Sequence, residues 1–499
     1  MRKHAVEILA VGVVASLVMM ACSSGTLQAP PSGATLSSGS GLVAVLVSDT
    51  PLCDVISFQV TVSGATLAPQ AGSAAISTQP VTLLSSTAPV RVDFAGLMDS
   101  SSILTFADVP TGTYSQATIT LSDPQMIYLD PSTSPPTPKA IVPTLATLVL
   151  TADIDPALVV TSGGTVGLDV DFRLLDSVEV DENGEITGNV DPVFSFSPRT
   201  STSANGFGEL DTLHGLVASV TPPTTSDTLA GSFTLETFGG EGPNLTVNTT
   251  DSTVLEGVAD LNSLLPSIFV EVNAFVDSSG NIVAREVDAE ALADPGQGRA
   301  AFVGVITSVT RDAPPNANEF TLVVGESAPD VSLSVPPTMN QVVKISPTTI
   351  FGIAAGEVNR AGLLFDASTL GVGQEVVVHG NFLGATPTSP AIINANSIFL
   401  RLQSVVGDYS TLAAAGADGK TGGFAFLPCR TLLNGRDFLA LTFAETEFSG
   451  LADLNSLKAA TTLIVKGLLF YEQSAGAVGD VSWTDPTLVI AAKRVRQLD

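Results

Sequence analysis

Hydrophobic and polar residues alternate along many short stretches of this chain, which is the pattern of half-buried β-strands. Residues 58–62, 117–121 and 166–172 alternate in this way. Residues 42–47 are instead continuously apolar, which predicts a strand that is buried on both faces. Gly, Pro, Asn and Asp separate most of these stretches, as turns between strands require. The pattern predicts an all-β protein.

Residues 41–198 are expected to form the first domain. Their short strands follow one another at the spacing of a β-sandwich, which is the fold we predict for this part of the chain. Residues 178–180 and 185–187 flank the sequence Asp-Glu-Asn-Gly, and we interpret them as the two strands of a hairpin.

The second half of the chain is repetitive. The hexapeptide Ala259–Leu264 recurs identically as Ala452–Leu457, 193 residues later. Thr253, Thr349 and Thr446 begin related motifs that are 96 and 97 residues apart. A fixed period of this length indicates tandem structural units. Three modules are predicted, at 208–291, 299–402 and 403–499.

Each module has the same predicted order of elements, which is three strands, a short helical turn and two further strands. This is the order of an oligonucleotide/oligosaccharide-binding (OB) barrel, in which the helix plugs one end. In the first module the strands are expected near 214–221, 231–238, 244–255, 268–276 and 282–289. The fold class expected is therefore a β-sandwich followed by three tandem small OB-like barrels, each with a short plugging helix.

The repeated hexapeptide lies in the predicted helical turn. Asp260 is placed to cap this turn, and Leu261, Leu264 and Leu265 are expected to share one face. We interpret Leu261 and Leu264 as buried plugs of the first barrel rather than as a ligand site. Leu454 and Leu457 should do the same in the third module.

Several motifs resemble known families. The sequences Val-Ser-Asp-Thr-Pro at 47–51, Val-Pro-Thr-Gly-Thr-Tyr at 109–114, Leu-Asp-Val-Asp-Phe at 168–172 and Asp-Pro-Val-Phe at 191–194 follow in order. Together they resemble the bacterial lipoprotein family called domain of unknown function 4382. That family has no assigned activity, so the resemblance implies no functional residues. The Gly-x-Val openings, the Phe-Thr-Leu second strands and the closing Ala-x-x-Val motifs of the modules resemble domain of unknown function 5666.

The N-terminus has the layout of a signal peptide. A basic start is followed by an uncharged apolar run, Ile8–Met20, which is too short to span a bilayer as a helix. The run ends at Ala21-Cys22, which is typical of a bacterial lipobox, although Met19 stands where Leu is usual. We predict that residues 1–21 are removed and that Cys22 is lipidated. An ordinary signal peptide, with Cys22 incidental, stays the alternative.

A flexible Ser/Gly/Pro-rich tether is expected at 22–40, between the anchor and the first domain. The expected location is therefore the cell envelope, where the exported chain would be a membrane-anchored lipoprotein of the outer membrane or cell surface. No later stretch approaches the length of a membrane span.

The chain is acidic, with 20 basic and 49 acidic residues and a net charge of −29. Without residues 1–21, which contain two basic and one acidic residue, the net charge becomes −30. Such a chain repels nucleic acid, because contacts with phosphate supply most nucleic-acid affinity. We expect partners to be the membrane, through Cys22, and a protein or glycan of the envelope, and no nucleic acid.

The sequence contains few motifs that would indicate catalysis or the binding of a cofactor or metal. The sequence lacks a nucleophile elbow, a His-Glu-x-x-His motif, a P-loop and a dinucleotide-binding motif. His214 and His379 fall on strands of different modules, and His379 is expected to be solvated on the polar side of its strand. Trp483 is interpreted as a packed aromatic side chain, with stacking on a sugar as the alternative. No cofactor and no metal are predicted.

Carboxylates also allow two interpretations. Asp169 and Asp171 could face one site, but alternation favours the wet face of a strand. Asp181, Asn183 and Glu185 mimic part of a calcium loop but lack its continuation, so a hairpin turn is expected.

The two remaining cysteines, Cys53 and Cys429, fall in different predicted domains, and a disulfide between them is not expected. The function predicted from sequence is a non-catalytic envelope lipoprotein whose β-domains are binding or structural modules. The alternative is an envelope hydrolase that uses surface carboxylates, which would require two carboxylates roughly 5–9 Å apart in a cleft.

Overall fold

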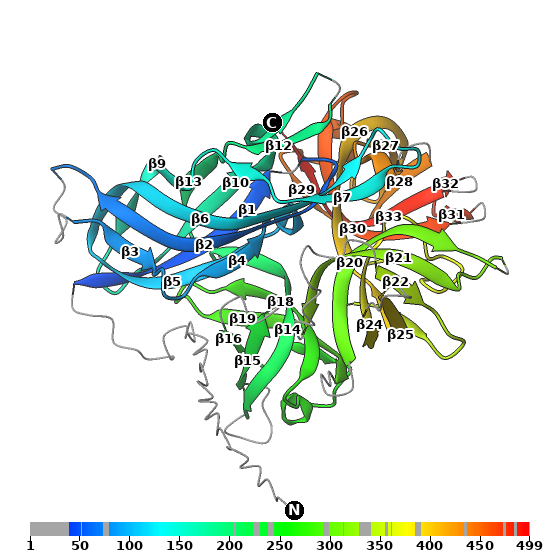
Figure 1. Cartoon of the computed structure of the whole chain (residues 1–499), viewed down its shortest axis with the longest axis horizontal. Helices are drawn as coiled ribbons and strands as arrows, with labels where there is room; N and C mark the ends of the chain where they lie inside the picture. Colours follow the sequence, from blue (N-terminus) through cyan, green and yellow to red (C-terminus); the bar gives the residue numbers. More distant parts are fainter. Residues whose placement is uncertain are drawn as a thin grey trace, which may run out of the picture.

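The computed structural model shows a nearly all-β chain in which four β-domains pack around a common centre (Figure 1). The residues described are 39–498, apart from 51, 73–78, 183, 203–205, 223–229, 238–243, 293–298, 313, 329–340, 355–357, 361, 385–390, 434–436, 473–475 and 484–486. The predicted signal peptide, Cys22 and nearly all of the predicted tether lie outside these residues.

The N-terminal domain consists of a ten-stranded sheet and a small three-stranded one. The large sheet has the order β3-β2-β6-β9-β13-β10-β1-β5, with β4 beside β2 and β7 beside β6. Its strands are β1 (Ser40–Thr50), β2 (Val55–Pro69), β3 (Val81–Leu84), β4 (Val90–Asp93), β5 (Ser102–Pro110), β6 (Gly112–Asp130), β7 (Thr137–Ile141), β9 (Val149–Val160), β10 (Thr165–Arg173) and β13 (Phe194–Arg199). One residue pair, Phe196–Ile154, joins β13 to β9, so the sheet has two sections that enclose one core.

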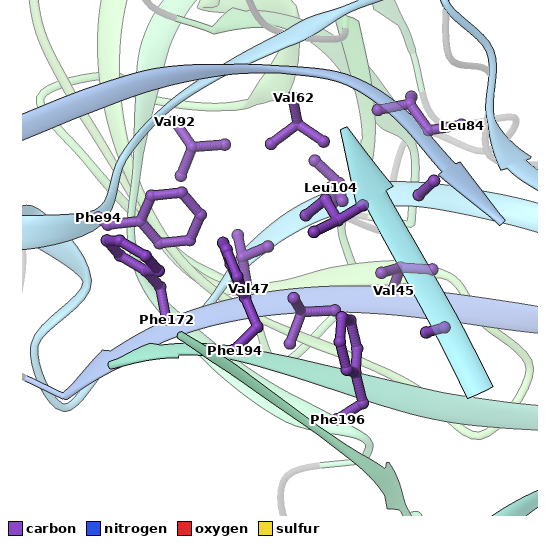
Figure 2. Close-up of a cluster of buried hydrophobic side chains, with 14 of the residues drawn as sticks. Val45, Val47, Val62, Leu84, Val92, Phe94, Leu104, Phe172, Phe194 and Phe196 are labelled. Atoms are coloured by element: carbon purple, nitrogen blue, oxygen red, sulfur yellow. The ribbon is translucent and has the colours of Figure 1, made fainter. Parts of the chain in front are cut away.

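Aromatic rings fill the centre of this core. Phe172 is fully buried, and its ring centroid lies 5.2 Å from that of Phe58, 4.9 Å from Phe94 and 4.7 Å from Phe194. Figure 2 shows Phe94, Phe172 and Phe194 close together within this core. Leu168, Val170 and Phe172 share the buried face of β10, as the alternation predicts, because successive strand residues point to opposite faces.

Strand β1 is buried on both faces, as its continuous apolar run predicts. It lies between β10, to which it runs parallel, and β5. Val43, Val45 and Val47 enter the aromatic core, whereas Ala44 and Leu46 pack on the other face against the first module. A central strand of the first domain is therefore also part of an interface between domains.

The small sheet consists of β8 (Thr144–Leu145), β11 (Val178–Val180) and β12 (Ile186–Val190). The predicted hairpin joins β11 to β12, and at its turn the amides of Asp181 and Gly184 bond to the carbonyls of Glu185 and Asp181. Asn183 lies outside the described residues.

The three modules are six-stranded barrels with one topology. In the first, the order is β16-β15-β14-β18-β19-β17, and a parallel pairing of β16 with β19 closes the barrel. The second and third repeat this order and closure, which confirms the tandem small barrels. The first module contains β14 (Gly208–Thr221), β15 (Ser232–Thr237), β16 (Asn244–Asn248), β17 (Val254–Glu256), β18 (Ile268–Val276) and β19 (Ile282–Leu292).

The other two modules follow in the same order of elements. The second contains β20 (Arg299–Thr310), β21 (Glu319–Ala328), β22 (Gln341–Lys344), β23 (Ile350–Ile353), β24 (Glu375–Leu383) and β25 (Ile392–Leu400). The third contains β26 (Leu402–Ala415), β27 (Gly422–Pro428), β28 (Asp437–Thr442), β29 (Glu447–Ser449), β30 (Thr462–Glu472) and β33 (Thr487–Gln497), with a small hairpin of β31 (Gly476–Val478) and β32 (Val481–Trp483).

A glycine in the first strand lets the neighbouring strand approach closely. A Cβ atom at Gly215, Gly304 or Gly407 would lie 2.1, 2.0 or 2.2 Å from a carbonyl oxygen of the next strand. No side chain fits at such a distance. Gly407 therefore takes the place of the opening glycine in the third module, where the sequence reads Gly-Asp-Tyr instead of Gly-x-Val.

In each module, a hydrogen bond joins the repeated threonine motif to the closing alanine motif. The hydroxyls of Thr253, Thr349 and Thr446 donate to the carbonyls of Ala284, Ala395 and Ala492 at 2.8, 2.9 and 2.8 Å. These are the threonine and alanine motifs by which the modules were recognised. Their repetition is explained by barrel structure rather than by a ligand.

The hexapeptide forms a short 3-10 turn in the first and third modules, at Leu261–Ser263 and Leu454–Ser456. Asp260 caps the first turn, because its Oδ1 accepts from the Ser263 amide at 2.9 Å. Leu261 and Leu264 are buried and Leu454 is buried, as predicted, whereas Leu457 is only half-buried.

The expectation that Leu265 shares this face is wrong, since its side chain is 57% exposed. The 3-10 turn ends before it, and the chain then turns toward β18. In the second module the corresponding described residues form a hydrogen-bonded turn capped by Asp366, which accepts from the amides of Ser368 and Thr369. Leu370 is the buried residue there.

Candidate functional site

The four domains meet at one junction, and several apolar clusters join neighbouring domains. Ala44 and Leu46 of the first domain pack with Phe207 and Leu210 at the start of the first module. The second and third modules share one apolar core. The remaining contacts join Phe269 to Ala301 and Val377, Met98 to Val406 and Ile464, and Leu129 to Val305 and Leu432.

A cavity of about 200 Å³ lies at this junction. Its walls come from all four domains, so we call it the central cavity. The first domain contributes β4 and the segment that follows it, and the modules contribute β14, β20, β21, β26 and β30. Its charged and titratable lining residues are Arg91, Asp93, His214, Glu326, Glu375, Arg401, Arg430 and Lys466.

Arg401 is the centre of a buried ion network beside this cavity. It lies between β25 and β26 and forms ion pairs with Glu271 of the first module and with Glu375 of the second, the latter at 3.0 Å. Its Nη2 lies 3.0 Å from Nδ1 of His214. The side chains of Arg401 and Glu271 are only 5% and 9% exposed, so these pairs are largely removed from water.

His214 connects this network to the second module. Its Nε2 lies 2.6 Å from Oε2 of Glu326. Burial alone would raise the pKa of Glu326, but the attraction of His214 and Arg401 outweighs it and holds that pKa below its usual value. For Glu375, burial prevails over Arg401 and raises the pKa.

His379 is buried, so the expectation that it is solvated is wrong. It is 5% exposed, bonds through Nε2 to Glu290, and its ring lies 5.1 Å from the ring of Phe269 across the interface of the first two modules. The polar side of its strand faces another module instead of water. Burial lowers the pKa of His379 to about 4, although Glu271 and Asp288 act in the opposite direction.

Carboxylates crowd the same interface. Asp288 lies on β19 beside Glu271 of β18 and Glu256 of β17 in the register of the sheet. Burial raises the pKa of Asp288 to about 7, and repulsion by Glu290 and Glu271 adds to the effect. Burial and Glu271 likewise raise the pKa of Glu290. Because several buried carboxylates lie close together, the stability of this interface depends on whether they are protonated.

Asp93 lines the cavity from the first domain. Burial raises its pKa to about 6, although its carboxylate accepts hydrogen bonds from Ser57 Oγ at 2.6 Å and from the Phe58 amide at 2.9 Å. The carboxylates on the cavity wall are therefore held by protein groups, Asp93 by these two, Glu326 by His214 and Glu375 by Arg401.

A second ion network joins the first domain, the first module and the third. Asp99 pairs with Arg496 at 3.1 Å and with Arg494 at 3.6 Å. Glu209 of β14 pairs with Arg494, with Lys493 at 3.3 Å and with Arg285 at 3.0 Å. These pairs bridge domains that are far apart in sequence.

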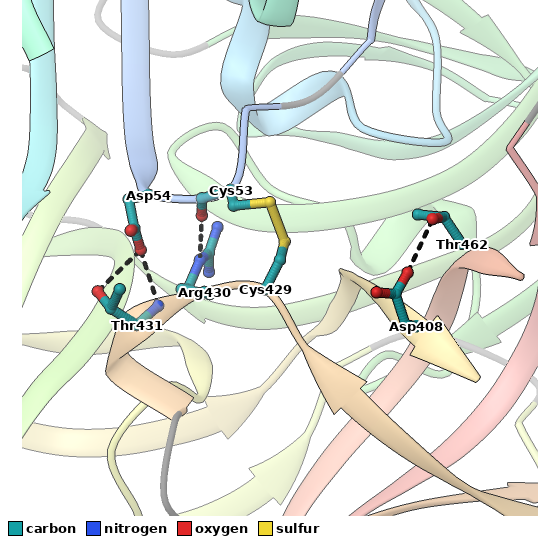
Figure 3. Close-up of a disulfide and its surroundings, with 7 residues drawn as sticks. All are labelled: Cys53, Asp54, Asp408, Cys429, Arg430, Thr431 and Thr462. Carbon is teal, nitrogen blue, oxygen red and sulfur yellow. Dashed lines mark hydrogen bonds between the residues drawn. A yellow bond between two sulfur atoms is a disulfide. The ribbon is translucent and has the colours of Figure 1, made fainter. Parts of the chain in front are cut away.

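Cys53 and Cys429 form a disulfide, so the expectation that they stay unpaired is wrong. Their sequence separation is 376 residues, and the bond joins the first domain to the third module (Figure 3). The contact is extended by Asp54, which accepts from the amide and hydroxyl of Thr431 at 2.8 and 2.9 Å. The pair was not expected because the two cysteines fall in different predicted domains. The sequence does not show that these two domains pack against each other.

The other carboxylates singled out in the sequence lie elsewhere. Asp169 and Asp171 share the outer face of β10, where they accept weak hydrogen bonds from Ser48 and a closer one from Thr50. Asp169 also pairs with Arg199 at 3.4 Å. Across the described ranges, no group of three or more His, Cys, Asp or Glu residues is placed to hold a metal ion.

Trp483 is packed, as expected. It lies on β32, its ring contacts Gly476 of the paired strand, and it packs against the core shared by the second and third modules. Asp181 and Glu185 belong to the hairpin turn, in which Asp181 Oδ1 accepts from the Glu185 amide at 2.8 Å.

Comparisons with solved structures give low scores. A single-stranded DNA binding protein from Thermus aquaticus is 13% identical, with 40% of this chain and 92% of that chain covered and a TM-score of 0.14. A second, titled drosophila Unr CSD456, is 9% identical, with 58% and 97% covered and a TM-score of 0.13. Likenesses at this level carry no argument about function. No curated protein matches the chain.

Within the described part of the chain, no helix has the length and apolar character needed to span a membrane. Family comparisons are informative for the first half of the chain. In the order that the motifs predict, residues 40–206 match the family described as domain of unknown function (DUF4382), and residues 214–288 match the family described as domain of unknown function (DUF5666).

Proposed function

We propose that this protein is an exported lipoprotein, lipidated at Cys22, whose four β-domains act as one rigid binding or structural body of the cell envelope without catalysis. The observation that carries the proposal is the disulfide between Cys53 and Cys429. It joins the first domain directly to the last module and turns a string of domains into a closed body.

The disulfide also supports export. Stable disulfides are formed in oxidising compartments and are rare in the cytosol of most organisms. The apolar run that ends at Cys22 supplies the matching signal. A lipid anchor of two or more acyl chains would then hold the protein stably at a membrane.

A binding role fits the chemistry of the junction better than hydrolysis does. A hydrolase that uses two carboxylates needs both to reach a substrate. At the central cavity, Asp93, Glu326 and Glu375 are each held by hydrogen bonds or ion pairs within the protein. The His214–Glu326 pair also crosses from the first module to the second and so favours docking of the domains, which is what a rigid binding body requires.

Metabolic labelling with a fatty acid in a bacterial host tests the anchor. The wild type and the matched control Ser24→Ala should incorporate the label, whereas Cys22→Ser should not. Equal labelling of Cys22→Ser would contradict the proposal. Small-angle scattering of residues 41–499, before and after reduction, tests the rigid body, which should expand only when the disulfide is reduced.

A further inference from the structure

Arg430 is a cation on the wall of the central cavity that belongs to neither of the two ion networks. It follows Cys429 directly and lines the cavity together with Met98 and Ser404. Its Nε donates to the Cys53 carbonyl at 3.3 Å. Within the residues that the structure describes, this is the only hydrogen bond of its guanidinium, which takes part in no ion pair.

The neighbouring charges are already engaged. Glu375 pairs with Arg401, and Asp54 accepts from the amide and hydroxyl of Thr431. Carboxylates near Arg430 therefore do not neutralise it by direct contact. Burial lowers the pKa of Arg430, with Glu375 and Asp54 acting in the opposite direction, so the charged guanidinium lies in an environment short of water.

Apolar side chains form part of the cavity wall. Ile56, Met98 and Val305 line the cavity, and Val305 packs with Leu432, two residues beyond Arg430. The volume of about 200 Å³ far exceeds the roughly 10–15 Å³ that one water molecule needs on the same measure. The cavity thus places the planar guanidinium of Arg430, with its parallel N–H donors, near apolar side chains. The space fits a ligand of a few heavy atoms.

We infer that the central cavity binds a small organic anion, a carboxylate with a short apolar chain, with its carboxylate on the Arg430 guanidinium and its chain against Ile56, Met98 and Val305. A guanidinium pairs with a carboxylate through two parallel hydrogen bonds, which a single ammonium cannot reproduce. The inference rests on the proposed binding function and names the ligand class for it.

Calorimetric titration of the mature chain with acetate, butyrate, octanoate and inorganic phosphate tests this inference. Butyrate should bind, and Arg430→Gln should weaken its binding at least about tenfold, because the variant loses charge-assisted hydrogen bonds to the carboxylate. Arg173→Gln is the matched control, since Arg173 is half-exposed and pairs with Asp176 away from the cavity. It should bind butyrate as the wild type does.

Thermal unfolding without ligand separates binding from structure. Because Arg430→Gln removes a half-buried charge that no carboxylate contacts, its midpoint should equal or exceed that of the wild type. Arg430→Lys keeps the positive charge but loses the two parallel N–H donors of the guanidinium, so it should bind butyrate more weakly than the wild type. This variant replaces Arg430→Gln in the test if Arg430→Gln fails to fold.

Three results would overturn the inference. These are no binding of any carboxylate to the wild type at millimolar concentration, equal binding of butyrate by wild type and the Arg430 variants, or phosphate binding as tight as that of butyrate. None of them bears on labelling at Cys22, so failure here is distinguishable from failure of the proposed function.

Discussion

The core of the first domain and the junction among the four domains are both buried, but the junction adds paired charges to its apolar contacts. The core is apolar and aromatic, with Phe172 in contact with three other rings. The junction contains charged groups such as Arg401 and Glu271, joined by ion pairs. Apolar burial stabilises each domain in any orientation of its neighbours, whereas paired charges stabilise only the arrangement that brings them together. The comparison teaches that the aromatic core acts mainly on folding of the first domain, whereas the ion pairs act mainly on docking of the domains.

Truncation of Phe172 should have the largest effect. Phe172→Ala should lower the free energy of unfolding of the first domain by about 3–5 kcal/mol, the range for a buried phenylalanine. Chemical denaturation followed by hydrogen exchange would locate the loss in β1–β13. A loss spread evenly over all four domains would show that folding and docking are not separate.

The barrel plug provides a matched pair of leucines. Leu264→Ala should cost about 2–5 kcal/mol in the first module because Leu264 is 2% exposed, whereas Leu265→Ala should change stability little because Leu265 is 57% exposed. Differential scanning calorimetry of the full chain compares the two. Equal effects would mean that the hexapeptide is not a structural plug and would reopen its role as a recognition surface.

Removal of Arg401 should act on docking. Arg401→Met leaves Glu271 and Glu375 without their shared cation and should weaken the junction by about 1.5–3 kcal/mol. Because the domain cores are untouched, small-angle scattering should show a looser molecule whose circular dichroism is unchanged. Loss of β-sheet signal in this variant would contradict the separation of docking from folding.

The junction should also weaken with alkali. The folded pKa of Asp288 is about 7 against 3.8 for the free side chain, so its protonated form favours docking, and that contribution is lost as pH rises through 7. His379, with a folded pKa of about 4 against 6.5, acts oppositely, and its contribution is lost as pH falls below 6.5.

Above pH 6.5 the carboxylates therefore dominate, and thermal midpoints should fall between pH 6.5 and pH 8. Asp288→Asn keeps the side chain uncharged and should flatten this fall. A slope equal to that of the wild type would assign the alkaline loss to other groups, such as Glu290, whose pKa is also raised.

The smallest expected effect is on nucleic acid. OB-like topology alone would suggest binding of single strands, but the net charge of −29 opposes it. Fluorescence anisotropy at 150 mM salt should detect no binding of single-stranded DNA by the full chain. Micromolar affinity would contradict the expectation.

Sequence patterns predicted the all-β fold and the tandem barrels but not the junction. Alternation identified the strands, and the threonine and alanine motifs proved to bond within each barrel. His379 was misjudged because a polar residue on the outer face of a strand has the same pattern whether it faces water or another module. Arg401 and Arg430 gave no signal, since each gains its role only when distant strands meet. The disulfide between Cys53 and Cys429 was not predicted for the same reason, because the two cysteines meet only in the folded chain.

The disulfide has a mechanical consequence. It closes a covalent ring that runs from Cys53 to Cys429 and contains the first two modules entirely. Tension applied between the two ends of the chain passes from one cysteine to the other and does not load the modules inside the ring. Only the segments outside it, before Cys53 and after Cys429, would be stretched. The first two modules would thus keep their fold under a pull that unravels the third.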